Sequence, residues 1–425
     1  MIERGEFRQI RDALLEAVCP VGTEEAPLEL AAGRILCRDV IATQDSPSFA
    51  RSPYDGYAFR SADVADASQD HPVTLRVIDH IPAGQVTHVK VTAGTAAHLM
   101  TGAPMPPGAD AVLPFEKTRF TKDTVTVLGP AAPGSNVICP GEDYQKGSVL
   151  GRAGVRIDAG LAGTLAGQGI FRPGVYRLPL VGVISTGTEI LQEGDSPEPG
   201  KIYNANRYSL QAACAEAGCR SIFLGTARDE EETICALIRE GLRTCDAVIL
   251  SGGVSVGDYD CTPAAMEMAG VEILARGAAI KPGMAGAYGI YDRNREGAGT
   301  GQSPEDQKRA PSCKIPVMAL SGNPAACMTA FYAIGLPVLK KRMGLREVIP
   351  PSVKVLLEKD YAGKKQTDRL LRGKIDPAAS IQKMTVLKKQ GNQMLSSLAG
   401  ANALALIPAD TKVQAGEPVE AFLLE

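Results

Sequence analysis

The stretch AVILSGGVSVGDYD, residues 247–260, is the most informative part of this 425-residue chain. Four apolar residues run directly into a turn that contains three glycines and two serines. A short apolar run of this kind is typical of a buried strand in a parallel sheet, where ligands bind beyond the carboxyl ends of strands. We therefore expect backbone N–H groups that hold an anion, with Asp260 as an oxygen ligand suited to magnesium. The alternative is a structural turn in which Asp258 or Asp260 caps the next helix.

Apolar runs and helical patterns alternate on both sides of this stretch. Strands are expected at 180–184, 221–224, 271–274, 287–290 and 317–320. Helices are expected from near Tyr208 to a stop at Gly218, from Asp229, from Thr262-Pro263, and after Asn323-Pro324. Strands that alternate with helices predict an α/β region with a mostly parallel sheet covered on both faces.

Other strand ends in this region also carry polar or glycine-rich turns. They are STGTE at 185–189, TARD at 226–229 and LSGNP at 320–324. Glu189 and Asp229 are the acidic candidates, although Glu189 also suits the first turn of a helix and Asp229 has capping-box spacing to Glu232. Lys281 precedes Pro282-Gly283, which bends the backbone and could aim the Lys281 ammonium group at an anion. The alternative is an ordinary lysine in a solvated turn.

The two flanking regions follow a β pattern instead. Residues 20–175 are rich in glycine, proline and short alternating runs, such as the one at 73–77. After residue 346 the alternation resumes at 353–357, and strand-like runs follow at 403–407 and 419–424, which predicts a small C-terminal β-domain. Residues 293–312 are polar, with little to bury, and predict a long mobile loop.

Composition excludes several classes of protein. The formal net charge of -3 provides no basic field for nucleic acid, and no apolar run is long enough to span a bilayer. The first 18 residues suit an amphipathic helix rather than a secretory segment. The ten cysteines form no Cys-x-x-Cys pair, and Cys214 and Cys235 occupy apolar helix positions. We therefore expect reduced, buried thiols in a cytoplasmic protein.

Three early turns add further candidates. DGYA at 55–58 places Asp55 before a glycine, MTGAP at 100–104 places Thr101 in a stiff loop, and GED at 141–143 carries Asp143. Each of these is a turn signal when it is taken alone. Thr101, for example, either donates to a phosphate or caps its own turn.

Taken together and in this order, the motifs resemble those of the molybdopterin molybdenumtransferases, including the gephyrin E domain. The resemblance covers nearly the whole chain apart from the 293–312 insert, and SGGVSVG at 251–257 is its most specific part. It implies a homodimer whose sites lie between the central domain of one subunit and N-terminal parts of the other. The implied substrates are adenylylated molybdopterin and molybdate, with Mg²⁺ assisting, and the products are molybdenum cofactor and AMP. Transient contacts with the adenylyltransferase and with molybdoenzyme apoproteins are expected as well.

The resemblance also implies a domain plan. The expected parts are a helical N-terminal domain at 1–26, 44–54 and 138–177, a β-rich domain at 27–43 and 55–137, a central molybdopterin-binding α/β domain at 178–342, and a C-terminal β-barrel at 343–425.

Motif matching then assigns roles to residues. The expected catalytic positions are Asp55, Thr101, Asp143, Glu189, Asp229, Asp260 and Lys281, with Asp229 and Asp260 as metal ligands. The expected binding positions are Ser251, Gly252, Gly253, Ser255, Gly257, Pro282, Gly283, Asn323, Pro324 and Ser396. For molybdate, the candidates are Arg369 or Arg372 together with Ser396 or Ser397.

Four departures from the family pattern leave other hypotheses open. Met284 stands where a second lysine is common, Ser321 where proline is common, Ala326 where a hydroxyl is common, and RSPY at 51–54 where Asn-Ser-Ala-Met is common. The alternatives to an insertase are therefore a non-catalytic carrier of molybdopterin or its cofactor, and a related molybdopterin adenylyltransferase.

Overall fold

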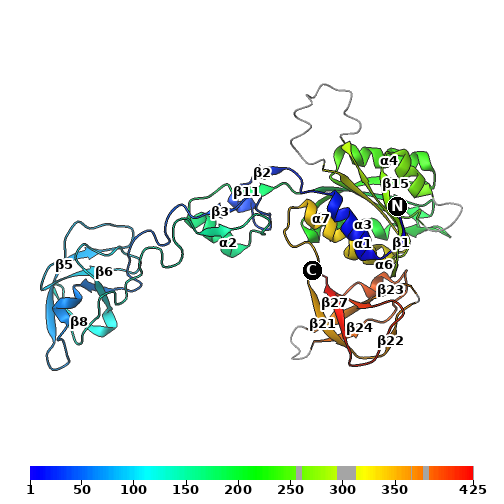
Figure 1. Ribbon diagram of the computed structural model, residues 1–425. Helices are drawn as coiled ribbons and strands as arrows, with labels where there is room; N and C mark the ends of the chain where they lie inside the picture. Colours follow the sequence, from blue (N-terminus) through cyan, green and yellow to red (C-terminus); the bar gives the residue numbers. More distant parts are fainter. Residues whose placement is uncertain (255–260, 294–312, 365, 377–381, 425) are drawn as a thin grey trace, which may run out of the picture. The chain divides into compact units, whose positions relative to one another are not determined.

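The computed structural model describes residues 1–254, 261–293, 313–364, 366–376 and 382–424. It divides into two compact units (Figure 1). Unit 1 contains residues 1–38, 153–162 and 172–425, and unit 2 contains residues 39–152 and 163–171. The expected four-domain plan cuts across this division, because residues 1–26 belong to unit 1 and residues 44–54 to unit 2, and it remains a proposal.

A seven-stranded sheet forms the centre of unit 1. Its strands, in spatial order, are β1 (Ile2–Gly5), β17 (Glu272–Ala278), β19 (Gly286–Tyr291), β20 (Ile315–Leu320), β16 (Ala247–Ser251), β12 (Leu180–Thr186) and β15 (Arg220–Ala227). Only β19 runs antiparallel to its neighbours among these described strands. β16, β19 and β20 are buried along their whole length, as expected of strands covered on both faces. The mostly parallel α/β arrangement is confirmed.

Helices cover both faces of this sheet (Figure 1). α4 (Glu231–Thr244) and α5 (Cys261–Met268) pack on one face, and α4 buries Ile234, Ile238 and Leu242 at helical spacing. The other face carries α1 (Phe7–Ala17), α3 (Ala205–Ala217), α6 (Pro324–Ala330) and α7 (Leu336–Arg342). No helix within the described ranges is both long and apolar enough to cross a bilayer.

The first residues join the central sheet. β1 pairs in parallel with β17, and α1 buries Phe7, Ile10 and Leu14 in the core beside α7. The amphipathic pattern predicted the helix, but it did not predict this strand pairing, because a four-residue edge strand has too little pattern to show its partner.

The C-terminal region is a closed five-stranded β-barrel. Its strands follow the order β23 (Asp368–Ile375), β24 (Lys383–Val386), β21 (Ser352–Leu357), β27 (Pro418–Leu423) and β25 (Ala403–Ile407), and β25 pairs back with β23. The short strand β18 (Ile280–Lys281) pairs with β23 and so joins the barrel to the central region. The expected small β-barrel is confirmed.

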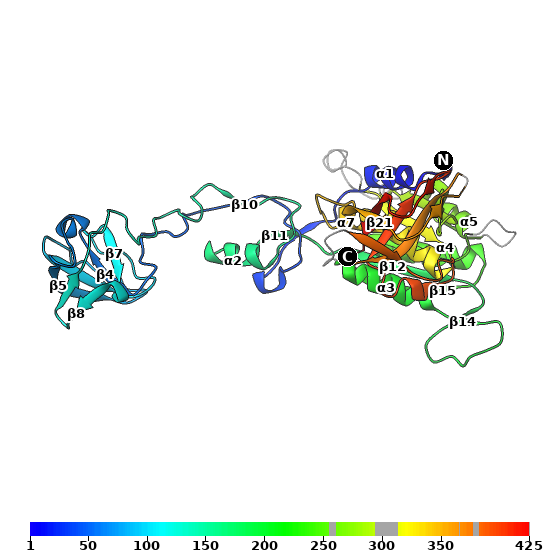
Figure 2. The same cartoon turned by 90° about the horizontal axis from the view of Figure 1, so that it is seen from below.

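Unit 2 is built on a six-stranded sheet, whose strands β4, β5, β7 and β8 are labelled in Figure 2. Its strands are β7 (Ala111–Pro114), β4 (Gly56–Phe59), β6 (Thr95–Leu99), β5 (Val73–Ile81), β9 (Thr124–Val127) and β8 (Thr118–Phe120). Short ladders elsewhere pair β2 (Thr23–Glu25) with β11 (Gly174–Tyr176), β3 (Val40–Ile41) with β10 (Val149–Gly151), and β13 (Ile190–Leu191) with β14 (Ile202–Tyr203). Residues of α2 (Ala159–Gly167) belong to both units.

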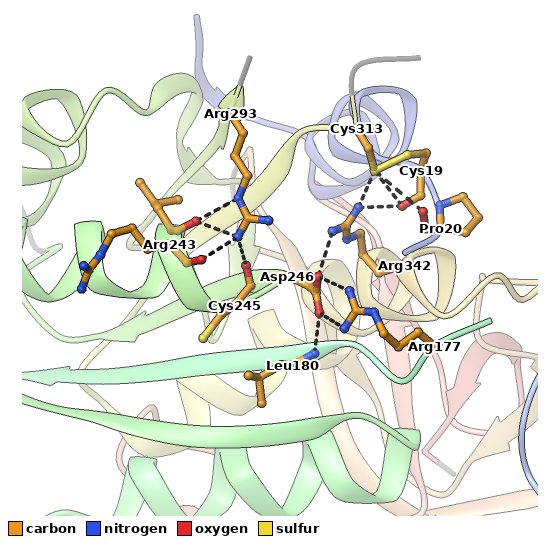
Figure 3. Close-up of polar contacts among 11 residues, drawn as sticks. Cys19, Pro20, Arg177, Leu180, Arg243, Cys245, Asp246, Arg293, Cys313 and Arg342 are labelled. Atoms are coloured by element: carbon orange, nitrogen blue, oxygen red, sulfur yellow. Dashed lines mark hydrogen bonds and ion pairs between the residues drawn. A yellow bond between two sulfur atoms is a disulfide. The ribbon is translucent and has the colours of Figure 1, made fainter. Parts of the chain in front are cut away.

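A polar cluster lies at the amino ends of β12 and β16 (Figure 3). The Asp246 carboxylate accepts hydrogen bonds from the Arg177 guanidinium at 2.8 and 3.1 Å and from the Leu180 N–H group at 2.9 Å. The nearly buried Arg342 guanidinium lies 3.9 Å from the same carboxylate. Arg293 donates to the last carbonyls of α4, including that of Leu242 at 2.8 Å.

One cysteine expectation is wrong. Cys19 and Cys313 form a disulfide across 294 residues of sequence, next to Arg342, which donates to the Cys19 carbonyl at 2.8 Å (Figure 3). The segment after α1 passes the start of β20 and brings the two sulfurs together, which spacing along the chain does not reveal. Cys214 and Cys235 are free and buried, as expected.

Candidate functional site

A cavity of about 810 Å³ opens at the carboxyl ends of β12, β16 and β20. We call it the strand-end cavity. The turns that the sequence selected contribute many of its lining residues: Ser185, Thr186, Gly187, Glu189, Asp229, Ser251, Gly252, Gly253, Ser321, Gly322, Asn323 and Pro324. Turns far apart in sequence meet here because the carboxyl ends of parallel strands share one edge of the sheet.

The described start of the glycine-rich turn after β16 lines this cavity. Gly252 and Gly253 have φ values of 105° and 64°, a left-handed region that favours glycine. A Cβ atom on Gly252 would lie 2.5 Å from the Thr186 carbonyl oxygen. Glycine therefore lets β12 and the turn approach each other. The positions Ser255, Gly257 and Asp260 lie outside the described residues.

Replacing Gly252 by alanine is expected to weaken ligand binding in the cavity about tenfold or more, because the turn must move away from Thr186. Calorimetric titration with AMP, a product that the family resemblance implies, checks this. Gly194→Ala is a matched control, since Gly194 also has positive φ but has open space around it. Equal affinities for both variants would contradict the role given to the close approach.

Two carboxylates stand at one side of the cavity. Asp229 accepts a hydrogen bond from the Thr188 N–H group at 3.3 Å, and Glu189 lies in the same turn region. The capping alternative for Asp229 is wrong, because α4 begins at Glu231 and its N-cap position is Glu230. No lysine or arginine is present among the described residues that line the cavity. A polyanionic ligand would therefore need a cation from elsewhere.

The KPGM turn only partly reaches the cavity. Gly283 and Met284 line it, whereas Lys281 is exposed in β18 opposite Arg369 of β23, and Pro282 is buried. Met284 is 46% exposed, and Ala326, the other departure from the family pattern, lines the cavity as a buried residue.

The C-terminal barrel contributes a loop to the cavity wall. Asn392 and Gln393 line it, and the Asn392 carbonyl accepts a hydrogen bond from the Ala326 N–H group at 3.1 Å. Sequence reasoning missed both residues, because a polar loop between two strands carries no distinctive pattern. It also missed Asn204 and Asn206, which line the cavity at the start of α3. The only signal there is Asn204, a good N-cap residue.

Arg372 stands behind this loop. It is fully buried, and its Nε donates to the Ser397 hydroxyl at 2.6 Å while Nη2 donates to the Gly391 carbonyl at 3.1 Å. Its Nη1 has no hydrogen-bond partner within the described part of the chain. Burial lowers the pKa of Arg372 to about 10, so the guanidinium is charged at neutral pH. Of the two serines considered from the sequence, Ser397 contacts this arginine and Ser396 is exposed.

The remaining candidates belong to unit 2. The Thr101 N–H and hydroxyl groups donate to one oxygen of Asp55 at 2.6 and 2.8 Å. These two hydrogen bonds hold the pKa of Asp55 below its ordinary value. Asp143 is exposed and accepts from the Ser46 hydroxyl at 3.4 Å. Asp55 and Thr101 therefore act as a pair, and Asp143 stands on another loop.

Three family models match the chain in succession. They are the MoeA N-terminal region (domain I and II) at residues 6–169, a probable molybdopterin binding domain at 182–341, and the MoeA C-terminal region (domain IV) at 354–424.

Relatives match along nearly the whole length. A molybdopterin molybdenumtransferase of Bacillus subtilis is 34% identical over 95% of this chain and 90% of its own length. One from Staphylococcus aureus is 33% identical over 94% and 90%. A crystal structure of a molybdopterin biosynthesis MoeA protein from Pyrococcus horikoshii has a TM-score of 0.79 at 31% identity and covers 98% of both chains. Another has a TM-score of 0.80 at 29% identity and covers 99% of this chain and 100% of that chain.

Proposed function

This chain belongs to the molybdopterin molybdenumtransferase (MoeA) family, and we propose that its strand-end cavity holds adenylylated molybdopterin during molybdenum insertion. It is a transferase of molybdenum cofactor biosynthesis. The observation that carries the assignment of the cavity is the convergence of three strand-end turns, including Ser251-Gly252-Gly253, on a space of about 810 Å³. That volume lies within the range of small-molecule sites.

A magnesium ion fits the acidic side of this cavity. Asp229 and Glu189 offer hard oxygen donors, and the described lining has no cationic side chain to balance a pyrophosphate. Asp260, which lies outside the described residues, is the second ligand that the sequence motif assigns beside Asp229. When bound, the ion would neutralise charge on the phosphoanhydride. The absence of side chains at Gly252 and Gly253 lets phosphate oxygens approach the backbone of the turn, while Asp229 is itself held by the Thr188 N–H group.

Molybdate is a dianion and needs a different environment. Arg372 supplies a buried positive charge whose Nη1 has no partner among the described residues, and its Nε donates to the Ser397 hydroxyl, which in turn donates to the Met394 carbonyl. We assign molybdate recognition to this pair rather than to Arg369 and Ser396. Arg369 instead stacks over the Tyr361 ring at 5.9 Å.

We further propose a homodimer in which Asp55, Thr101 and Asp143 of one subunit complete the cavity of the other. Asp55, Thr101 and Asp143 lie on unit 2 and do not line the strand-end cavity of unit 1, and the hydrogen bonds from Thr101 keep Asp55 ionised. A second copy of the chain could bring these residues to the cavity.

The test is to mix the purified protein with adenylylated molybdopterin, Mg²⁺ and molybdate, and to measure AMP by chromatography. We expect AMP release that depends on molybdate. Tight binding of the pterin without AMP release would instead favour a carrier, and would make Met284 and Ala326 marks of lost catalysis.

A further inference from the structure

Gln168 is a buried glutamine of unit 2 that directly follows α2 and uses both ends of its amide. Its Oε1 accepts from the Thr43 N–H group at 2.8 Å, from the Thr43 hydroxyl at 3.0 Å and from the Gln44 N–H group at 3.2 Å. Its Nε2 donates to the Gln44 carbonyl at 3.1 Å and to the Tyr144 hydroxyl at 3.3 Å. The two N–H groups and the carbonyl settle the orientation of the amide. One side chain therefore ties the segment at Thr43 and Gln44 to Tyr144.

The segment that Gln168 holds is also the support of Asp143. Ser46 lies two residues after Gln44, and its carbonyl accepts from the Asp143 N–H group at 2.9 Å. The Ser46 N–H group donates to the Tyr144 carbonyl at 2.8 Å, and the Ser46 hydroxyl donates to the Asp143 carboxylate at 3.4 Å. The backbone and the carboxylate of Asp143 are thus both bound to Ser46, and Gln168 holds the chain next to each side of this contact.

The chain continues from this contact to the other two candidates of unit 2. We call residues 46–55 the strap. Near its middle, the fully buried Ser52 exchanges two backbone hydrogen bonds, of 2.8 and 3.0 Å, with the loop that carries Thr101. At its end, Asp55 accepts from the N–H and hydroxyl groups of Thr101. The strap therefore bears the Asp143 turn at its start and the Asp55–Thr101 pair at its end.

Resting on the proposed function, we propose that Gln168 is a positioning residue for the reaction. By fixing the start of the strap, it sets the place of the Asp143 carboxylate relative to Asp55 and Thr101. An exposed carboxylate reaches the cavity of a second subunit in one geometry only if its backbone is held. A misplacement of about 1 Å can lower a rate by about a hundredfold. Gln168 does not touch the substrate in this role and acts through the chain at Ser46.

The test variant is Gln168→Met, which keeps the length of the buried side chain and removes its hydrogen bonds to Thr43, Gln44 and Tyr144. Amide hydrogen exchange of the full-length protein needs no substrate and reports local opening. We expect exchange to become about tenfold faster in segments 43–46 and 141–144, because their backbone loses its anchor. Exchange at Gly102, whose N–H group donates to the Ser52 carbonyl, should stay unchanged.

Ser61→Ala is the matched control for this measurement. Ser61 is buried in the same unit, and its hydroxyl donates to Asp110 at 2.8 Å. This variant therefore loses a buried hydrogen bond but should keep slow exchange in both segments. Unchanged exchange in Gln168→Met would overturn the inference. Equally faster exchange throughout unit 2 would do the same, because Gln168 would then be a general stabiliser of the fold.

The contribution to the reaction is measured as AMP release in single turnovers. We expect Gln168→Met to lower kcat about tenfold and to leave KM for adenylylated molybdopterin within about twofold. On an Asp143→Asn background, Gln168→Met should cause no further loss, because two residues that act through one group are not additive. A further tenfold loss in the double variant would overturn the inference. Failure of the unaltered protein to release AMP would contradict the proposed function, and the exchange pattern would still decide whether Gln168 holds the Asp143 turn.

Discussion

Replacing Asp229 by asparagine is expected to lower molybdate-dependent AMP release by about a hundredfold or more. Asparagine keeps the size of the side chain and can still accept from the Thr188 N–H group at 3.3 Å. What it removes is one negative charge from a cavity whose described lining has no lysine or arginine. If that charge holds Mg²⁺ against the pyrophosphate, the substitution lowers the rate of AMP release and leaves the stability of the fold unchanged.

The measurement is initial AMP release at several magnesium concentrations, with thermal unfolding recorded in parallel. We expect the magnesium concentration for half-maximal rate to rise in Asp229→Asn, with an unchanged unfolding temperature. Asp195→Asn is the control, since Asp195 is a nearby carboxylate that accepts from the Gln192 N–H group at 2.7 Å and does not line the cavity. A variant that keeps its rate and its magnesium dependence would remove Asp229 from the metal site.

The same variant also tests the proposed homodimer. Asp55→Asn in unit 2 and Asp229→Asn in unit 1 should each be inactive alone. If a site combines Asp229 of one subunit with Asp55 of the other, a mixed dimer has one intact site. Subunit exchange between equal amounts of the two variants should then restore about a quarter of the full activity. No recovery after exchange would mean that each subunit forms its site alone or that Asp55 has another role.

The sequence predicted the central fold well because strand ends and helix stops have local causes. The apolar run at 247–250 became β16, and Gly218 ends α3 with a φ of 90°. The turns after β12, β16 and β20 meet in one cavity because the pairing of those strands is parallel. Parallel pairing follows from the alternation of strands and helices, so this part of the site could be predicted from the sequence pattern alone.

The contributions that the sequence did not predict depend on tertiary contacts. Helical periodicity placed the start of α3 near Tyr208, whereas the helix begins at Ala205 with Asn204 as its cap. Periodicity reports the buried face of a helix and not its polar first turn, so the asparagines were missed. Asn392 and Gln393 reach the cavity only because the barrel docks through β18 and β23. No local pattern encodes such docking.

Removing the Asp246 carboxylate is expected to destabilise unit 1 by about 3–5 kcal/mol, a large part of an ordinary folding free energy. In Asp246→Ala, Arg342, which is 4% exposed, keeps its charge but loses the carboxylate 3.9 Å away. The Leu180 N–H group also loses its acceptor (Figure 3). Arg177→Ala is the matched variant. Because the Arg177 side chain is 46% exposed, its loss should cost only about 1 kcal/mol.

The pH dependence separates this charge effect from simple loss of packing. Burial raises the pKa of Asp246, but hydrogen bonds from Arg177 and the Leu180 N–H group outweigh it and hold the pKa below its ordinary value. The unfolded chain therefore binds the proton more readily, so the stabilisation is complete above about pH 4 and is lost as pH falls through the folded-state pKa. Urea unfolding measures the free energy of unfolding of the unaltered protein and of Asp246→Ala at pH 7 and pH 3. The difference between the two proteins should be smaller at pH 3. An equal difference in unfolding free energy at both pH values would mean that Asp246 stabilises the fold through packing, and that Arg342 finds another partner when the carboxylate is gone.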